Sequence, residues 1–161
     1  MLKFAGWSGA LQRIALTLWV GAMWGIGFLV VPVLFAGLQD RALAGEIAGS
    51  LFHLVSYLAI VCACVILLTE VPRKTRRTGA WKFSGLIIVM LLVTLFAEFF
   101  VAPYMTSIQQ QAVNGLVPGT PLHAQFTIWH RVATALFVLN SVLGMFAVLA
   151  MQPDLLKRTS N

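Results

Sequence analysis

Four long apolar stretches constrain this chain more than any other feature of its sequence. They cover approximately residues 14–38, 47–69, 83–102 and 126–151. The hydrocarbon core of a bilayer is about 30 Å thick, and a helix needs about 20 apolar residues to cross it. The stretches are continuous rather than alternating, which favours helices over the strands of a membrane barrel. The sequence therefore predicts an all-α integral membrane protein, folded as a single domain over residues 1–161.

The composition excludes the other common classes of protein. Hydrophobic residues make up 60% of the chain and charged residues only 10%, whereas soluble domains carry about 25% charged residues. Disordered chains are poor in apolar side chains, and two cysteines cannot form a disulfide framework. The sequence contains no P-loop, dinucleotide-binding or nucleophile-elbow motif. We therefore expect a membrane protein without catalytic activity.

The basic residues predict how the chain is oriented. Nine of its eleven Lys and Arg residues flank the two termini and the loop between the second and third spans, whereas Arg41 and Arg131 fall near the opposite face. Short cytoplasmic loops are enriched in Lys and Arg. We therefore expect an up-down-up-down four-helix bundle with both termini cytoplasmic. Its net charge of +6 predicts contact with anionic lipids at the cytoplasmic face, and no binding of nucleic acid. The nine residues are Lys3, Arg13, Arg73, Lys74, Arg76, Arg77, Lys82, Lys157 and Arg158.

Small residues at helical spacing are candidates for close helix packing. Gly21 and Gly25 form a GxxxG motif in the first span, and Gly45 and Gly49 repeat this spacing at the start of the second. Such motifs let membrane helices approach one another closely. Packing within the bundle is our favoured interpretation, and a homo-oligomer or a larger membrane complex is the alternative. Pro32 lacks a backbone donor and predicts a kink near the outer end of the first span.

Polar side chains within the spans are the candidate functional residues, because they are costly in a bilayer. His53, Glu98 and His130 belong to three different spans. At about 1.5 Å per helical residue, all three lie roughly 6–8 Å below the outer boundary of the hydrocarbon core. The sequence thus places two imidazoles and a carboxylate in one layer, beneath a pocket that opens outward. Asn140 lies deeper in the fourth span, where we expect an interhelical hydrogen bond.

The sequence leaves four interpretations of this layer open. In the first, Glu98 and Arg131 form a structural ion pair and no cofactor is bound. In the second, His53, Glu98 and His130 bind zinc, iron or copper, with His123 as a further ligand. In the third, His53 and His130 ligate haem b. In the fourth, Glu98 exchanges a proton in a small-solute carrier that works as an oligomer. Arg41 and His123 stand at the mouth of the predicted pocket.

Two stretches resemble the transmembrane protein 205-like family of small bacterial membrane proteins. They are LWVGAMWGIGFLVVPVLFAGLQDRALAG, from Leu18 to Gly45, and FTIWHRVATALFVLN, from Phe126 to Asn140. The resemblance covers nearly the whole chain and implies a four-pass membrane protein whose domain has no assigned function. Arg131 departs from the family pattern, in which a small residue follows the histidine. The positions that match the pattern are Trp19, Gly21, Pro32, Phe35, Arg41, Gly45, His130 and Asn140.

Together, these observations predict a small accessory or binding protein of the membrane. Its polar pocket, formed by His and Glu side chains, is expected to hold a metal or a small ligand. We expect no resident cofactor, with a transition metal or haem b as the alternatives. The expected partners are the lipid bilayer and either a second copy of the chain or a larger membrane complex.

Overall fold

The chain forms a bundle of long helices. The computed structural model describes residues 2–70, 80–112 and 116–151, and the regular structure within these ranges is entirely helical. Four helical rods each contain a candidate span of 30 or 31 residues, long and apolar enough to cross a membrane. They are Trp7–Gly37, Arg41–Glu70, Lys82–Gln111 and Pro121–Ala150. The prediction of an all-α chain with four membrane-spanning helices is therefore confirmed.

The first and third rods are each built from three consecutive segments, whereas the second and fourth are single helices. The first rod consists of α1 (Leu2–Trp24), η1 (Gly25–Val30) and α2 (Val31–Gly37). The third consists of α4 (Ala80–Phe96), η3 (Ala97–Val101) and α5 (Ala102–Gln111). The second rod is α3 (Arg41–Glu70), and the fourth is α6 (Pro121–Ala150). The segments η1 and η3 are π-helical, so their turns are wider than those of an α-helix.

A proline follows each π-helical segment. Pro32, where the sequence predicts a kink, lies in the first turn of α2, and the N–H of Val31 donates to the carbonyl of Ile26, five residues earlier. A second proline, Pro103, lies in the first turn of α5. The N–H of Ala102 donates to the carbonyl of Ala97, again five residues earlier. A proline ring clashes with the carbonyl four residues before it in a regular helix. The wider π turn relieves this clash in both rods.

Side-chain caps begin the second and fourth rods. Oδ1 of Asp40 accepts hydrogen bonds from the N–H groups of Ala42 and Leu43, at 2.8 and 3.1 Å. Oγ1 of Thr120 accepts a hydrogen bond from the N–H of His123 at 3.3 Å. These oxygens satisfy backbone donors that have no partner within the helix. The caps fix where α3 and α6 start, and therefore how deep their polar residues lie.

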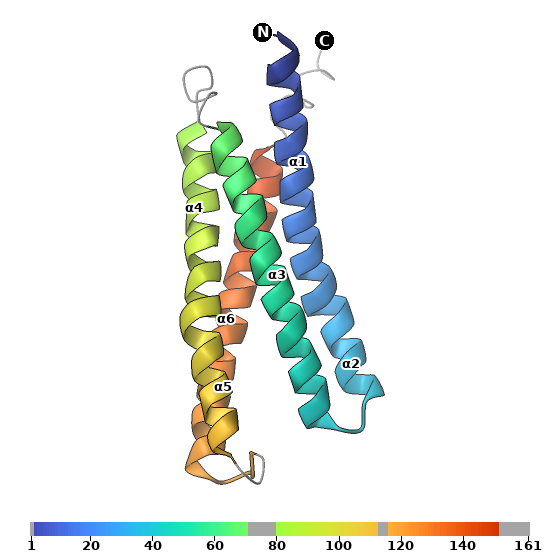
Figure 1. Cartoon of the computed structure of the whole chain (residues 1–161), viewed down its shortest axis with the longest axis vertical. Coiled ribbons are helices and arrows are strands. Elements are labelled where there is room, and N and C mark those ends of the chain that lie inside the picture. Colours follow the sequence, from blue (N-terminus) through green and yellow to red (C-terminus); the bar gives the residue numbers. More distant parts are fainter. Residues whose placement is uncertain (1, 71–79, 113–115, 152–161) are drawn as a thin grey trace.

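Consecutive rods run in opposite directions. Figure 1 shows that the start of α1 and the end of α6 lie at one end of the bundle, which we call the terminal end. The opposite end, which we call the far end, contains α2 and α5. Helix α1 packs against α3 and α6, and α4 packs against the same two helices. The order around the bundle is therefore α1, α3, α4, α6.

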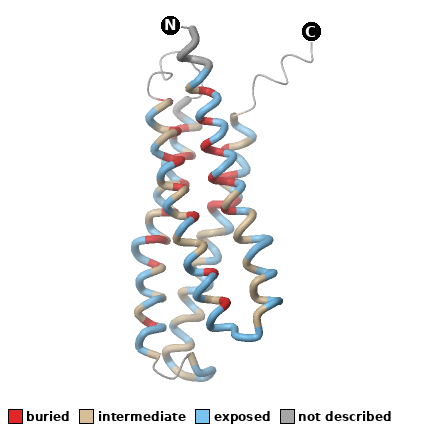
Figure 2. The backbone as a smooth tube through the Cα atoms, turned by 45° about the vertical axis from the view of Figure 1, so that its right-hand side comes forward, coloured by how far each residue is buried: buried red, intermediate tan, exposed pale blue. Residues whose placement is uncertain are grey.

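The tightly packed core lies towards the terminal end and the middle of the bundle. Leu16 and Trp19 of α1, Ile66 of α3, and Ile87 and Met90 of α4 are all at most 1% exposed and belong to one cluster. Figure 2 shows that buried residues are denser in this part of the bundle than near the far end. Packing of this cluster holds the four rods together.

Towards the far end the bundle separates into two hairpins. Helix α2 packs against α3, and α5 packs against α6. Figure 1 shows these two pairs diverging from one another. We call α1, η1, α2 and α3 the first hairpin, and α4, η3, α5 and α6 the second hairpin. Contacts between the hairpins at the level of η1 and η3 are therefore made by individual side chains that reach across.

Several of the basic residues that predict the orientation lie outside the described part of the chain. These basic residues lie in the loop between α3 and α4 and in the segment after α6. The side chain of Lys3 is likewise not described. The residues concerned are Arg73, Lys74, Arg76, Arg77, Lys157 and Arg158.

Candidate functional site

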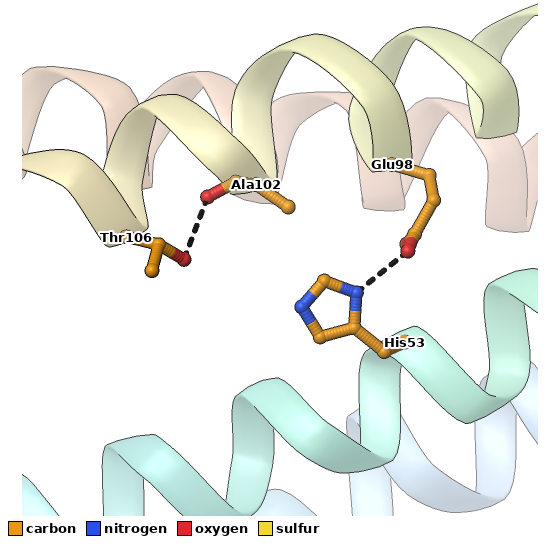
Figure 3. Close-up of polar contacts among 4 residues, drawn as sticks. All are labelled: His53, Glu98, Ala102 and Thr106. Atoms are coloured by element: carbon orange, nitrogen blue, oxygen red, sulfur yellow. Dashed lines mark hydrogen bonds and ion pairs between the residues drawn. The ribbon is translucent and has the colours of Figure 1, made fainter.

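The structure brings together two of the three ionisable residues that the sequence places in one layer. His53 comes from α3 in the first hairpin, and Glu98 comes from η3 in the second. Nδ1 of His53 lies 2.6 Å from Oε1 of Glu98, which is a short hydrogen bond. Figure 3 shows the two side chains pointing towards one another across the space between their helices. This contact ties the two hairpins together at the level where they begin to diverge.

The two partners differ strongly in burial. The side chain of Glu98 is only 6% exposed, whereas that of His53 is 44% exposed. When the imidazole is the neutral tautomer that donates Nδ1–H to this carboxylate, the lone pair of Nε2 is free. Figure 3 shows the second ring nitrogen of His53 pointing away from Glu98. A carboxylate that orients an imidazole in this way prepares the opposite nitrogen to bind a metal or a hydrogen-bond donor.

The backbone around Glu98 is itself unusual. Glu98 is the second residue of the π-helical segment η3, five residues before Pro103. Isolated π-helical turns inside α-helices are frequent at functional sites, because the wider turn changes the direction of the side chains that it carries. The chain thus combines a buried carboxylate, an irregular turn and an accessible imidazole in one place.

The other histidines do not join this pair. His130 is exposed on α6, and its ring stacks on that of Phe126, with centroids 6.0 Å apart and an interplanar angle of 15°. His123 is half-buried in the first turn of α6. Among the described residues, no group of three or more His, Cys, Asp or Glu side chains is placed to hold a metal ion. The shared depth of His53, Glu98 and His130 therefore does not gather them into a three-ligand metal site.

The predicted ion pair between Glu98 and Arg131 is also not formed within the described ranges. Glu98 is bonded to His53 instead, and both Arg131 and Arg41 are exposed. Arg131 is the immediate neighbour of the exposed His130 on α6, so it shares the outward-facing side of that helix. The buried carboxylate therefore has an imidazole, and not a guanidinium, as its partner.

Asn140 makes the kind of interhelical bond that the sequence predicts. Its Nδ2 donates to Oγ1 of Thr94 on α4 at 3.0 Å, and Oγ1 of Thr94 donates to the carbonyl of Met90 at 3.0 Å. Both side chains are buried. The oxygen of the same amide, Oδ1 of Asn140, and the hydroxyl of Ser141 have no hydrogen-bond partner among the described residues. This polar group links the two helices one turn away from Glu98.

The sequence does not predict a buried polar pair that lies near the terminal end. Nε2 of Gln12 on α1 donates to Oε2 of Glu70 on α3 at 2.7 Å, and both residues are at most 5% exposed. Each lies just outside an apolar stretch, so the sequence does not predict either residue within a span. The only signal in the sequence is that Glu70 directly follows the second stretch without a helix breaker between them.

The two GxxxG motifs are not used for packing inside the chain. A Cβ atom added at Gly21, Gly25, Gly45 or Gly49 would meet nothing within 4 Å. This corrects our favoured interpretation, in which these glycines pack the bundle. The motifs lie on faces that the first hairpin does not turn towards the rest of the bundle, so the close approach that they permit is open to a helix from outside the chain.

Gly27 allows close packing between the hairpins, as Gly144 of α6 does against Val20 of α1. A Cβ atom at this position would overlap the ring of Phe137 on α6, with Cε2 at 2.7 Å and Cε1 at 2.9 Å. The ring of Phe137 also contacts Phe28, with centroids 5.3 Å apart, and Phe52, with centroids 5.7 Å apart. Phe52 precedes His53 on α3. Phe28, Phe52 and Phe137 therefore form an aromatic cluster between the two hairpins.

Comparison with known proteins identifies a family and no activity. Residues 14–114, nearly two thirds of the chain, match the family model described as a domain of unknown function, DUF4149. Neither the curated proteins nor the solved structures contain a match to this chain. His53, Glu98 and Gly27 lie within the matched residues, whereas His130, Phe137 and Asn140 follow them.

Proposed function

The chain belongs to the DUF4149 family, and from this premise we propose that it is a non-catalytic membrane protein that binds a small ligand or a metal through His53. The finer assignment, to the transmembrane protein 205-like proteins, is part of the same proposal. It is supported by the motif in the first rod, where Trp19, Gly21 and Pro32 match the family pattern. The binding role, by contrast, comes from the geometry of His53 and Glu98.

The proposed location is the bacterial inner membrane, with both termini in the cytoplasm. The support is the excess of Lys and Arg on one side of the predicted spans. In this orientation the terminal end of the bundle contacts the anionic lipids of the cytoplasmic leaflet. The far end then points to the periplasm, so the His53–Glu98 pair lies in the outer half of the bilayer.

The observation that carries the binding role is the 2.6 Å bond between Nδ1 of His53 and Oε1 of Glu98. A buried carboxylate in a membrane-spanning segment is costly unless it is paired. Here the pairing partner is itself 44% exposed. Glu98 therefore orients an imidazole whose other nitrogen remains available. A purely structural pair has no need of this accessible second nitrogen.

We also propose that the outer surface of the first hairpin binds a helix from outside the chain. The open faces of Gly21 and Gly25 permit close approach by a helix. That helix belongs either to a second copy of this chain or to a larger membrane complex. The oligomeric state in mild detergent, measured by light scattering, tests the first of these two possibilities.

The binding role is tested on protein purified in mild detergent without added metal. Elemental analysis, an absorption spectrum and native mass spectrometry of the same sample identify any metal, haem b or small molecule that is bound. Zinc is then titrated into ¹⁵N-histidine-labelled protein, which has only three imidazoles to follow. We expect a bound species or a saturable zinc response that involves Nε2 of His53.

Two variants decide the result. His53→Ala is expected to abolish the binding, and His130→Ala is the matched control because its imidazole is exposed and, among the described residues, stacks on Phe126 alone. Unchanged binding in the folded His53→Ala variant would overturn the proposal. So would wild-type protein that contains no bound species and shows no zinc response at His53.

A haem spectrum that depends on both His53 and His130 would instead favour the redox alternative. Counter-transport of protons by the reconstituted protein, lost in Glu98→Gln, would favour the carrier alternative.

A further inference from the structure

The depth of His53 limits which molecules can reach it. His53 is the thirteenth of the 30 residues of α3, so it lies roughly 18 Å from the start of a helix about 45 Å long. A hydrocarbon core about 30 Å thick, centred on this helix, extends to within roughly 8 Å of each end. The imidazole therefore lies about 10 Å inside the nearer boundary. At this depth the exposed part of the ring faces a region occupied by lipid-soluble molecules.

The unpaired nitrogen then sets the chemistry of the ligand. Nε2 of His53 has no hydrogen-bond partner among the described residues, whereas Nδ1 is bonded to Glu98. Inside a hydrocarbon core a polar atom without a partner is costly. In the neutral tautomer that donates Nδ1–H to Glu98, Nε2 presents a lone pair and is satisfied by a hydrogen-bond donor. An uncharged donor enters hydrocarbon more easily than a charged one. A hydroxyl group is both a hydrogen-bond donor and uncharged.

A repeated sequence pattern places the ligand between the hairpins. GFLVVP, from Gly27 to Pro32, aligns with EFFVAP, from Glu98 to Pro103, with Phe, Val and Pro at matching positions. Both segments also contain the π turn that precedes the proline. The first residue of each segment faces a helix of the other hairpin: Gly27 contacts Phe137, and Glu98 bonds to His53.

Paired interruptions at corresponding positions of two halves mark ligand sites in membrane transporters, and such sites lie at the interface of the halves. In this chain the corresponding position is occupied by a glycine in one half and by a glutamate in the other. The glycine makes room for an aromatic ring, whereas the glutamate orients an imidazole. The interface between the hairpins is therefore apolar on one side and polar on the other.

The apolar part of this interface is aromatic. Phe52 lies next to His53 in the sequence, and its ring contacts that of Phe137. Phe137 in turn contacts Phe28 of η1. Flat rings in the same interface as a hydrogen-bonding group suit a ligand with a planar or unsaturated body. We infer that the ligand of His53 is a membrane-soluble alcohol or phenol, which donates its O–H to Nε2 and packs its apolar body against these rings.

This assignment rests on the proposed function, because it names the class of ligand for the same nitrogen. It is tested with two probes of nearly equal shape, para-nonylphenol and para-nonylanisole. Only the phenol has an O–H to donate. Each is titrated into ¹⁵N-histidine-labelled protein in lipid nanodiscs, and the three imidazoles are followed by NMR. We expect a saturable shift at Nε2 of His53 with the phenol, and at least tenfold weaker binding of the anisole.

Further outcomes separate the two proposals. Equal binding of phenol and anisole, or a phenol response that leaves the His53 signals unchanged, overturns the assignment of the ligand class. Zinc binding at His53 without any phenol response overturns this assignment and leaves the proposed function standing. In His53→Ala we expect the phenol affinity to fall at least tenfold, with His130→Ala as the control. The comparison of the two probes on wild-type protein decides the question even if His53→Ala does not fold.

Discussion

Replacing Gly27 with alanine is expected to weaken the contact between the two hairpins. The added methyl group would overlap the ring of Phe137, with Cε2 and Cε1 at 2.7 and 2.9 Å. The ring must then move away from its contacts with Phe28 and Phe52. Overpacking of this kind costs about 1–3 kcal/mol. Alanine also favours a helix over glycine by about 0.5–1 kcal/mol, so this gain offsets part of the loss.

Gly21→Ala is the matched control. It makes the same chemical change six residues earlier in the same rod, where a Cβ atom would meet nothing within 4 Å. We therefore expect Gly21→Ala to leave the free energy of unfolding unchanged or slightly raised. The difference between the two variants gives the cost of the overlap alone, about 1–3 kcal/mol, which corresponds to a factor of roughly 5 to 150 in the folding equilibrium.

The assay is reversible unfolding in mixed micelles with increasing sodium dodecyl sulfate, followed by tryptophan fluorescence. The same pair of variants is then made in a Phe137→Leu background, where the shorter side chain should relieve most of the overlap. A coupling energy above about 0.5 kcal/mol between positions 27 and 137 is expected for residues in contact. Equal stability of Gly27→Ala and Gly21→Ala would refute the close packing of the hairpins at Gly27.

Three other predictions concern the buried polar pairs. Thr94→Val removes the acceptor of the Asn140 amide and is expected to lower the free energy of unfolding by about 1–2 kcal/mol. Glu70→Ala leaves the buried amide of Gln12 without its carboxylate partner and should cost about 1–3 kcal/mol in the same unfolding assay. Glu98→Ala removes the group that orients the imidazole bonded to it, so the ¹⁵N signals of that ring should change from one fixed tautomer to an average of two.

Matched controls exist for these variants. Thr127→Val removes a hydroxyl that bonds only to the carbonyl of His123 on its own helix, and it should have little effect on stability. Glu46→Ala removes an exposed carboxylate from the same helix as Glu70. Stabilities of Thr94→Val and Glu70→Ala that match these controls would contradict the structural role of the buried pairs. A fixed tautomer at His53 in Glu98→Ala would contradict the orienting role of the carboxylate.

The depth of the polar residues was predictable from the sequence, whereas their orientation around the helix axis was not. Depth depends only on the number of residues from the membrane boundary, so His53 and Glu98 were correctly placed in one layer. Orientation turns by about 100° per residue. A span boundary that is uncertain by one or two residues therefore leaves the direction of a side chain undetermined. This is why the sequence predicts the same layer for His130 as for His53, although His130 is exposed on α6.

The packing glycines illustrate the same difficulty. Gly21, Gly25 and Gly27 lie within one short stretch of the first rod, and the spacing of GxxxG selects the first two. The structure uses Gly27, because a π turn begins at Gly25 and changes the direction of the residues that follow it. Pro32 marks the place of this irregularity in the sequence, but hydrophobic periodicity does not distinguish a π turn from a kink.

The divergence of the two hairpins gives the bundle a tapered outline, wider at the far end than at the terminal end (Figure 1). A tapered protein occupies more area in one leaflet than in the other and alters the lateral packing of the lipids around it. Such a shape is expected to favour membrane regions whose curvature spreads the leaflet around the wide end.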